Sequence, residues 1–176
     1  MVQYRRNRVA GGTYFFTVTL RDRTARCLVE RIDDLKLSIQ TVKRERPFRI
    51  DAMVVLPEHL HTVWSLPPDD DDYAGRWRLI KARFSRALVK AGVGLRRNDK
   101  GEYDLWQRRY WEHTIRDEAD LQRRVNYVHY NPVKHGWVKQ VHQWPYSTFH
   151  RDVAKGIYLQ DWAGSDKETD DKGYGE

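Results

Sequence analysis

The chain of 176 residues is long enough for one ordinary domain with its own hydrophobic core, and its frequent Trp, Tyr and Phe residues exclude a disordered protein. Its one cysteine cannot form an internal disulfide, and no apolar run approaches the ~18 residues that a membrane-spanning helix needs, so we expect a cytoplasmic protein. The formal net charge is +7, distributed as −3 on residues 166–176 and +10 on the remainder, which favours a polyanionic partner.

The first part of the chain predicts a strand, a helix and two further strands. Aromatic and β-branched residues predict a strand over 13–20. Asp33 is a suitable N-cap for a helix that runs to about Arg46, where a proline follows as a stop. The segments 48–56 and 59–66 predict two strands joined by a short turn, and therefore a closely paired hairpin.

The next part of the chain alternates helix, strand and helix. Over 73–91, apolar residues recur at the spacing of an amphipathic helix. Residues 106–115 predict a short, irregular strand, and Asp117 is a good N-cap for a helix that reaches about Tyr130. The order β-α-β-β-α-β-α is typical of an α+β domain, in which helices pack on one or both faces of an antiparallel-rich sheet.

The composition changes near residue 163. Beyond it the sequence is small, charged and aperiodic, which is typical of a segment that packs on nothing. We therefore expect residues 1–163 to form the domain and residues 164–176 to form an acidic, disordered tail.

Two histidines alternate with an apolar residue on the predicted strand 59–66. Side chains at i and i+2 of a strand point to the same face, so His59 and His61 would present two imidazoles side by side. That spacing suits one divalent ion. Two surface histidines without a ligand would give the same pattern, so the pair needs support from other residues.

A second polar pair lies on the helix predicted after Asp117. Tyr127 and Asn131 are four residues apart, so a phenol and an amide oxygen would share one helix face and could both reach a metal-bound phosphate. The ordinary alternative is a helix C-terminus in which the tyrosine packs and the asparagine caps. Because a residue before proline avoids helical geometry, Pro132 leaves open whether Asn131 lies on the helix.

Together these segments resemble the REP-associated tyrosine transposases, a branch of the HUH-type (His-hydrophobe-His) single-strand transposases. The resemblance extends over roughly residues 3–150 and is carried by the motifs at 12–15, 56–61, 106–113 and 127–136. The first motif departs from the family's usual Gly-Thr-Trp-Tyr but keeps its aromatic character.

The resemblance implies a ferredoxin-like α+β fold, an antiparallel sheet with packed helices, in which strand-borne histidines bind Mg²⁺ or Mn²⁺. Carried over, His59 and His61 are metal ligands, Asn131 takes the place of the third polar ligand, and Tyr127 is the nucleophile. The implied substrate is single-stranded DNA beside a palindromic, REP-like hairpin, cut and rejoined through a 5′-phosphotyrosine intermediate. Two imidazoles favour Mn²⁺ over Mg²⁺, which prefers oxygen ligands. Tyr130 is the other candidate nucleophile, at the predicted helix end where packing is the simpler role.

Basic residues outside the metal site are the expected DNA contacts, because arginine with aromatic neighbours suits both backbone contact and base stacking. They form an N-terminal arm, a stripe on the helix 73–91 and a group near the irregular strand. In chain order they are Arg5, Arg6, Arg8, Arg76, Arg83, Lys90, Arg96, Arg97, Arg108 and Arg109. We expect a nucleoid-associated monomer, with a dimer as the alternative.

Two other functions remain open from the sequence. In a metallohydrolase, water would be the nucleophile and no covalent adduct would form. Its third histidine ligand would be one of His113, His129 and His135. The other function is that of a hairpin DNA-binding protein that has lost cleavage, although intact His59, His61 and Tyr127 count against this.

Overall fold

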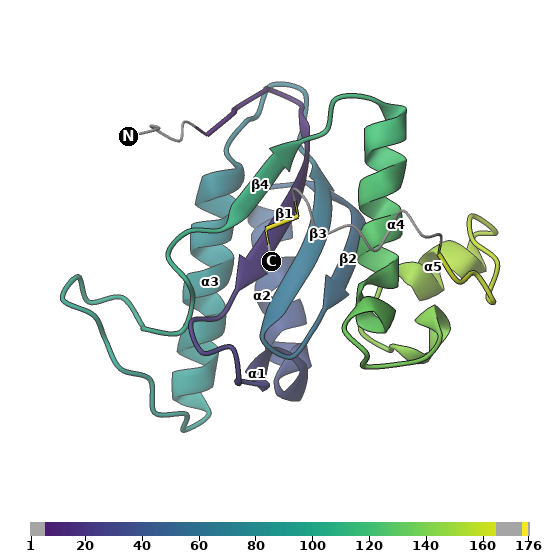
Figure 1. The fold of residues 1–176 in the computed structure, drawn as a ribbon. Coiled ribbons are helices and arrows are strands. Elements are labelled where there is room, and N and C mark those ends of the chain that lie inside the picture. The colour runs from purple at the N-terminus through teal and green to yellow at the C-terminus, as the bar shows by residue number, and fades with distance from the viewer. Residues whose placement is uncertain (1–5, 165–173, 176) are drawn as a thin grey trace.

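A four-stranded antiparallel sheet forms the centre of the molecule in the computed structural model, which describes residues 6–164 and 174–175 (Figure 1). Its strands are β1 (Thr13–Thr19), β2 (Arg49–Val55), β3 (His59–Ser65) and β4 (Trp111–Thr114). The spatial order is β2-β3-β1-β4, so that β3 lies between β1 and β2. This split βαβ arrangement is typical of ferredoxin-like folds and confirms the predicted α+β class.

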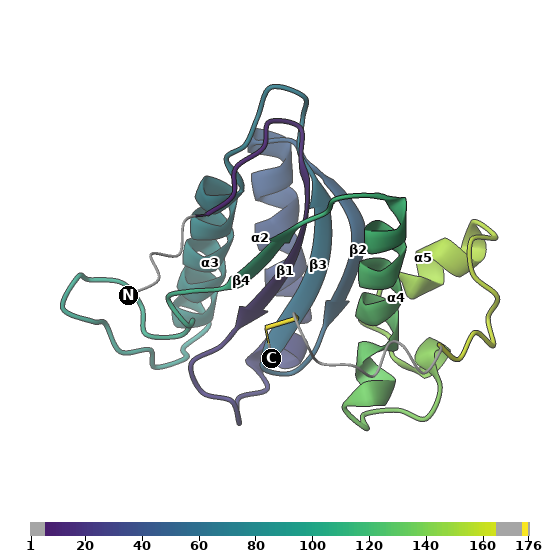
Figure 2. The ribbon, with the colours of Figure 1, turned by 45° about the horizontal axis from the view of Figure 1, so that its top comes forward.

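Helices cover both faces of the sheet (Figures 1 and 2). The first face packs against α2 (Ile32–Glu45) and α3 (Tyr73–Lys90), which lie side by side. The opposite face packs against α4 (Glu118–Lys134). Three short helices complete the described chain: α1 (Cys27–Glu30), the 3-10 helix η1 (Val141–Gln143) and α5 (Phe149–Ala154).

The alternation of side chains along β3 decides which residues face α4. Trp64 stacks on Trp77 of α3, with ring centroids 4.2 Å apart. Its neighbour Val63 points to the opposite face and belongs to the core cluster that contains Tyr127 of α4. His59 and His61 are an even number of residues from Val63, so the strand directs both imidazoles toward the α4 face. The same-face prediction for the two histidines agrees with this arrangement.

The predicted limits of α2 and β4 are wrong. α2 begins at Ile32, one residue before the predicted N-cap, and Asp33 instead lies in the first turn, where its carboxylate complements the helix dipole. β4 has only four residues rather than the predicted 106–115. Before β4, Trp106 makes only an isolated bridge to Leu20, because the chain there leaves the sheet edge to form a loop.

α4 extends past its predicted end at Tyr130. Asp117 caps its N-terminus as predicted, since its side chain accepts a hydrogen bond from the Asp120 backbone N–H at 2.7 Å. Pro132 removes one backbone donor but does not end the helix, and the N–H of His135 donates to the carbonyl of Asn131 at 3.0 Å. Asn131 therefore lies on the helix, one turn after Tyr127.

Candidate active site and DNA interface

His59 and His61 lie side by side beneath α4, with ring centroids 4.9 Å apart and less than 2% of either residue exposed. Both rings are held through Nδ1. The Nδ1 atom of His59 is 2.8 Å from a carboxylate oxygen of Glu58, and that of His61 is 2.8 Å from the hydroxyl of Thr17 on β1. These contacts orient each ring, so Nε2 is the atom through which each imidazole could coordinate a metal ion.

The residues at this position fit a divalent ion. The Nε2 atom of His59 is buried and has no hydrogen-bond partner in the described part of the chain. Asn131, fully buried on α4, offers an amide oxygen as a possible third ligand atom beside the two imidazole nitrogens. A buried imidazole nitrogen without a partner is costly, and metal coordination would remove that cost.

A third histidine ligand finds little support. His113 pairs with Asp120 at 2.7 Å, and His129 pairs with Asp152 at 3.1 Å, so both are engaged elsewhere. His135 lies nearer, with its ring centroid 5.2 Å from that of His59. Nevertheless, residues 6–164 and 174–175 contain no group of three or more His, Cys, Asp or Glu side chains that could hold a metal ion.

Tyr127 approaches the histidine pair from α4. Its buried ring meets that of His61 edge-on, with centroids 5.3 Å apart. Lys134 donates a hydrogen bond from Nζ to the Tyr127 hydroxyl oxygen at 2.8 Å, and its Nζ is 4.7 Å from the centre of the ring. A cation at the phenol oxygen stabilises the phenolate, which is the nucleophilic form.

Sequence reasoning missed Lys134. It is seven residues after Tyr127 and therefore two helical turns away on the same face. The predicted helix ended at Tyr130, so the seven-residue spacing did not place Lys134 on the same helix face as Tyr127. Tyr130 itself packs in a different cluster, beneath α5 with Phe149, which favours Tyr127 as the nucleophile.

Tyr174 covers Tyr127. Residues 165–173 and 176 of the expected disordered tail lie outside the described residues, but Tyr174 is described and only 8% exposed. Its ring is stacked face to face on Tyr127, its carbonyl accepts a hydrogen bond from the Thr17 hydroxyl, and the Arg124 guanidinium lies 4.4 Å from its ring centre. The packing of this residue departs from the expectation of a disordered segment.

The structure corrects the prediction that Arg76 contacts DNA. Its side chain is 1% exposed and is satisfied by protein groups: the carboxylate of Asp70 and the carbonyls of Arg46, Pro47 and Asp72. On the same face of α3, Arg83 pairs with Glu45 of α2, whereas Lys90 is exposed. Arg76 is therefore a structural residue at the start of α3.

The other predicted DNA contacts occupy different places. Arg83 is paired with both carboxylate oxygens of Glu45 on α2 at 2.7 Å. Arg5 lies outside the described residues. Lys90, Arg96 and Arg109 are exposed. One cavity between α3 and the loop before β4 brings together Arg6, Arg8, Arg97 and Arg108.

None of the described helices is both long and apolar enough to cross a membrane.

The chain is similar to known transposases over almost its whole length. Residues 9–131 match the family model described as IS200-like transposases. The REP-associated tyrosine transposase of Escherichia coli K12 is 52% identical over 93% of this chain and 92% of its own. A protein of Haemophilus influenzae is 44% identical over 94% of this chain and 95% of its own.

A solved structure supports the same assignment. It is described as a REP-associated tyrosine transposase bound to a REP hairpin, and it is 49% identical to this chain. The match has a TM-score of 0.88 and covers all of this chain and 98% of the other. The tyrosine on α4 thus faces two strand-borne histidines within a fold shared with this relative. Given this fold, the family match and the sequence identity to known members, the chain belongs to the IS200-like transposase family, in its branch of REP-associated tyrosine transposases.

Proposed function

We propose that this transposase cuts and rejoins single-stranded DNA beside a palindromic, REP-like hairpin, with Tyr127 as the nucleophile. The observation that carries the proposal is the position of Tyr127. Its ring packs against His61, and its hydroxyl oxygen accepts a hydrogen bond from Lys134. The hairpin substrate is supported by the solved relative, which is described as bound to a REP hairpin.

Mg²⁺ or Mn²⁺ would be held by His59, His61 and Asn131. Such an ion neutralises the charge of the scissile phosphate as a Lewis acid. Nitrogen donors from two imidazoles favour Mn²⁺, and the amide oxygen is a ligand that also suits Mg²⁺. Glu58 and Thr17 hold the Nδ1 atoms of the two rings, so they would act as positioning residues.

Tyr127 would attack phosphorus from its hydroxyl oxygen. The phenol loses its proton to solvent, and the Lys134 ammonium stabilises the oxygen anion. The bond from phosphorus to the 3′ oxygen breaks, and that oxygen leaves as a 3′-hydroxyl after taking a proton from solvent. The product is a 5′-phosphotyrosine. Because one phosphoester replaces another, a 3′-hydroxyl can reverse the step without an external energy source.

A single copy of the chain can perform this reaction. The proposed ligands, nucleophile and phenolate-stabilising lysine come from β3 and α4 of the same molecule. The proposed site needs no residue from a second chain, which supports a monomer.

A covalent adduct tests the proposal. The protein is incubated with a hairpin oligonucleotide that carries single-stranded flanks, in Mn²⁺, in Mg²⁺ and in EDTA, and is then separated on a denaturing gel. We expect a metal-dependent adduct with the natural chain and with Tyr130→Phe, and none with Tyr127→Phe. Sequencing of the DNA-linked peptide identifies the tyrosine. Strand cleavage without an adduct would instead indicate a water nucleophile, and binding without cleavage a hairpin-binding protein.

A further inference from the structure

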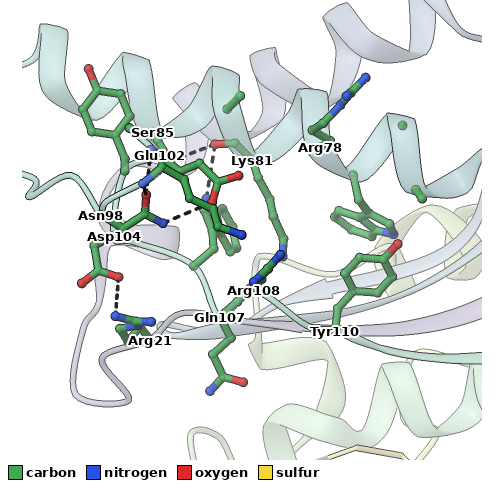
Figure 3. Close-up of a pocket in the computed structure, with 18 of the residues that line it drawn as sticks. Arg21, Arg78, Lys81, Ser85, Asn98, Glu102, Asp104, Gln107, Arg108 and Tyr110 are labelled. Atoms are coloured by element: carbon green, nitrogen blue, oxygen red, sulfur yellow. Dashed lines mark hydrogen bonds and ion pairs between the residues drawn. The ribbon is translucent and has the colours of Figure 1, made fainter. Parts of the chain in front are cut away.

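A cavity of about 860 Å³ lies on the α3 side of the sheet, away from the histidine pair. It is bounded by α3 and by the loop between α3 and β4 (Figure 3). That loop folds back on itself through a bridge between Arg97 and Tyr103. Its volume is in the range of sites that enclose small ligands, which extend to about 1,000 Å³.

The cations of this cavity exceed the anions that could neutralise them. Nine arginines and lysines line it, against four acids, of which Asp104 is paired with Arg21 at 2.6 Å and Glu102 accepts a hydrogen bond from Asn98. In contrast, Arg78 and Arg108 make no ion pair with any described residue. The cavity therefore has a surplus of positive charge, which favours an anionic ligand.

Lys81 connects this charge to an aromatic surface. It extends from α3 and donates a hydrogen bond to the carbonyl of Gln107 at 3.0 Å (Figure 3). Its Nζ lies 5.1 Å from the ring centre of Tyr110 and 5.7 Å from that of Trp106. Among the described residues, no carboxylate forms an ion pair with it. An ammonium placed between aromatic rings, with a carbonyl as its partner, can accept a phosphate as its counter-ion.

We propose that this cavity binds an unpaired nucleotide of the single strand that flanks the hairpin. Lys81, Arg78 and Arg108 would contact its phosphates, and the base would lie against Tyr110. A base in a duplex has both faces stacked, so an aromatic side chain that lines a cavity selects an unpaired one. The inference rests on the proposed function in one respect, that DNA is the ligand.

The edge of the sheet links this cavity to the active site. β4 is the edge strand next to β1, and Tyr110 and Trp111 stand at its start. Tyr110 packs with the α3-side cluster, whereas Trp111 is opposite Thr17, whose hydroxyl contacts His61. Trp111 is 40% exposed. Consecutive aromatic residues on opposite faces let one strand of DNA pass around this edge, from the cavity to the histidine pair.

Binding measurements without metal, in the Tyr127→Phe background, separate this inference from the cleavage chemistry. The probes are one hairpin with a single-stranded flank and the same hairpin without it. We expect Lys81→Met and Arg108→Ala each to weaken binding of the flanked hairpin about tenfold and to leave the blunt hairpin unchanged. The slope of the salt dependence for the flanked probe should fall by about 0.7 for each phosphate that the variant no longer neutralises.

Matched variants guard against general damage. Arg109→Ala removes the same charge one residue outside the cavity and should not distinguish the two probes. Tyr110→Phe should bind normally, whereas Tyr110→Leu should lose affinity for the flanked probe alone. Ultraviolet crosslinking of a flank that contains 4-thiothymidine should label a peptide from residues 103–110. Equal losses for both probes, or a crosslink elsewhere, would overturn the inference, while adduct formation by the unmodified chain would leave the proposed function intact.

Discussion

The ring of Tyr174 is stacked on the ring of Tyr127, with centroids 3.6 Å apart and planes inclined by only 10°. A phosphate cannot approach the face of Tyr127 that Tyr174 covers. The stack is one of the contacts that would have to open before attack, and an aromatic pair of this kind contributes about 0.5–1.5 kcal/mol beyond its buried area.

Tyr174→Ala should therefore speed adduct formation about three- to tenfold under single-turnover conditions, since about 1.4 kcal/mol corresponds to tenfold. Tyr174→Phe keeps the stacked ring and should behave like the natural chain. Because Tyr174 also packs in the core cluster of Tyr127, the alanine variant should melt at a lower temperature. Unchanged or slower adduct formation by Tyr174→Ala would show that the stack does not restrain the nucleophile.

Lys134→Met should slow adduct formation about 10- to 100-fold, the range expected when a charge-assisted hydrogen bond is removed. Hairpin affinity should change little, and Lys134→Arg should recover part of the rate because it restores a cation. Lys139→Met, which removes an exposed lysine beyond α4, is the control. A rate for Lys134→Met within about twofold of normal would exclude the lysine from the reaction.

His59→Ala and His61→Ala should each remove metal-dependent cleavage and leave most of the hairpin affinity intact. Thr17→Val tests the positioning of His61 more gently and should weaken apparent Mn²⁺ affinity about 10- to 100-fold. Thr19→Val, on the same strand but without a side-chain hydrogen bond to either histidine, should match the natural chain. Metal titrations of cleavage give these values, and near-normal cleavage by either alanine variant would make the histidines structural.

Lys81 provides a pH signature for DNA binding. Burial, together with the nearby Arg6, lowers the pKa of Lys81 to about 8. The ammonium is thus present below pH 8 and is lost as pH rises through that value, so affinity for a flanked hairpin should decline between about pH 7.5 and 9. Tyr110, whose ring centre is 5.1 Å from the Lys81 Nζ, faces it as well, and Arg78 and Arg108 line the same cavity.

The same pKa predicts the pH dependence of stability. The folded-state value is below the ordinary value of 10.5, so the unfolded chain binds more protons between about pH 8 and 10.5. This group therefore makes the fold more stable as pH rises through that interval. Lys81→Met should lack both effects, and an affinity profile identical to that of the natural chain would rule out Lys81 as a phosphate contact.

Local patterns were enough to predict the parts of the site that depend on local geometry. Strand alternation placed His59 and His61 on one face, and helical spacing placed Asn131 one turn after Tyr127. Both inferences depend only on the period of the secondary structure. The prediction that Arg76 contacts DNA was wrong because α3 has two polar flanks beside its apolar face, and the sequence does not say which flank meets α2.

Other parts depend on contacts between distant segments. Lys134 entered the site only because α4 continues through Pro132, which packing against the sheet supports in spite of the local cost. Tyr174 stands among charged and small residues, and nothing near it in sequence indicates burial. Its contacts with Thr17 and Tyr127 are set by the three-dimensional fold alone.

On the proposed mechanism, the division of the site between β3 and α4 ties DNA breakage to the completion of folding. The histidines and the tyrosine are separated along the chain by α3, the loop after it and β4, and contacts between such distant segments form late. A ribosome-bound chain that has released the histidine strand still lacks Tyr127, the proposed nucleophile. A partly unfolded molecule from which α4 has detached is again without one. Under that mechanism, the order of the elements along the chain would keep immature and damaged copies from cutting DNA.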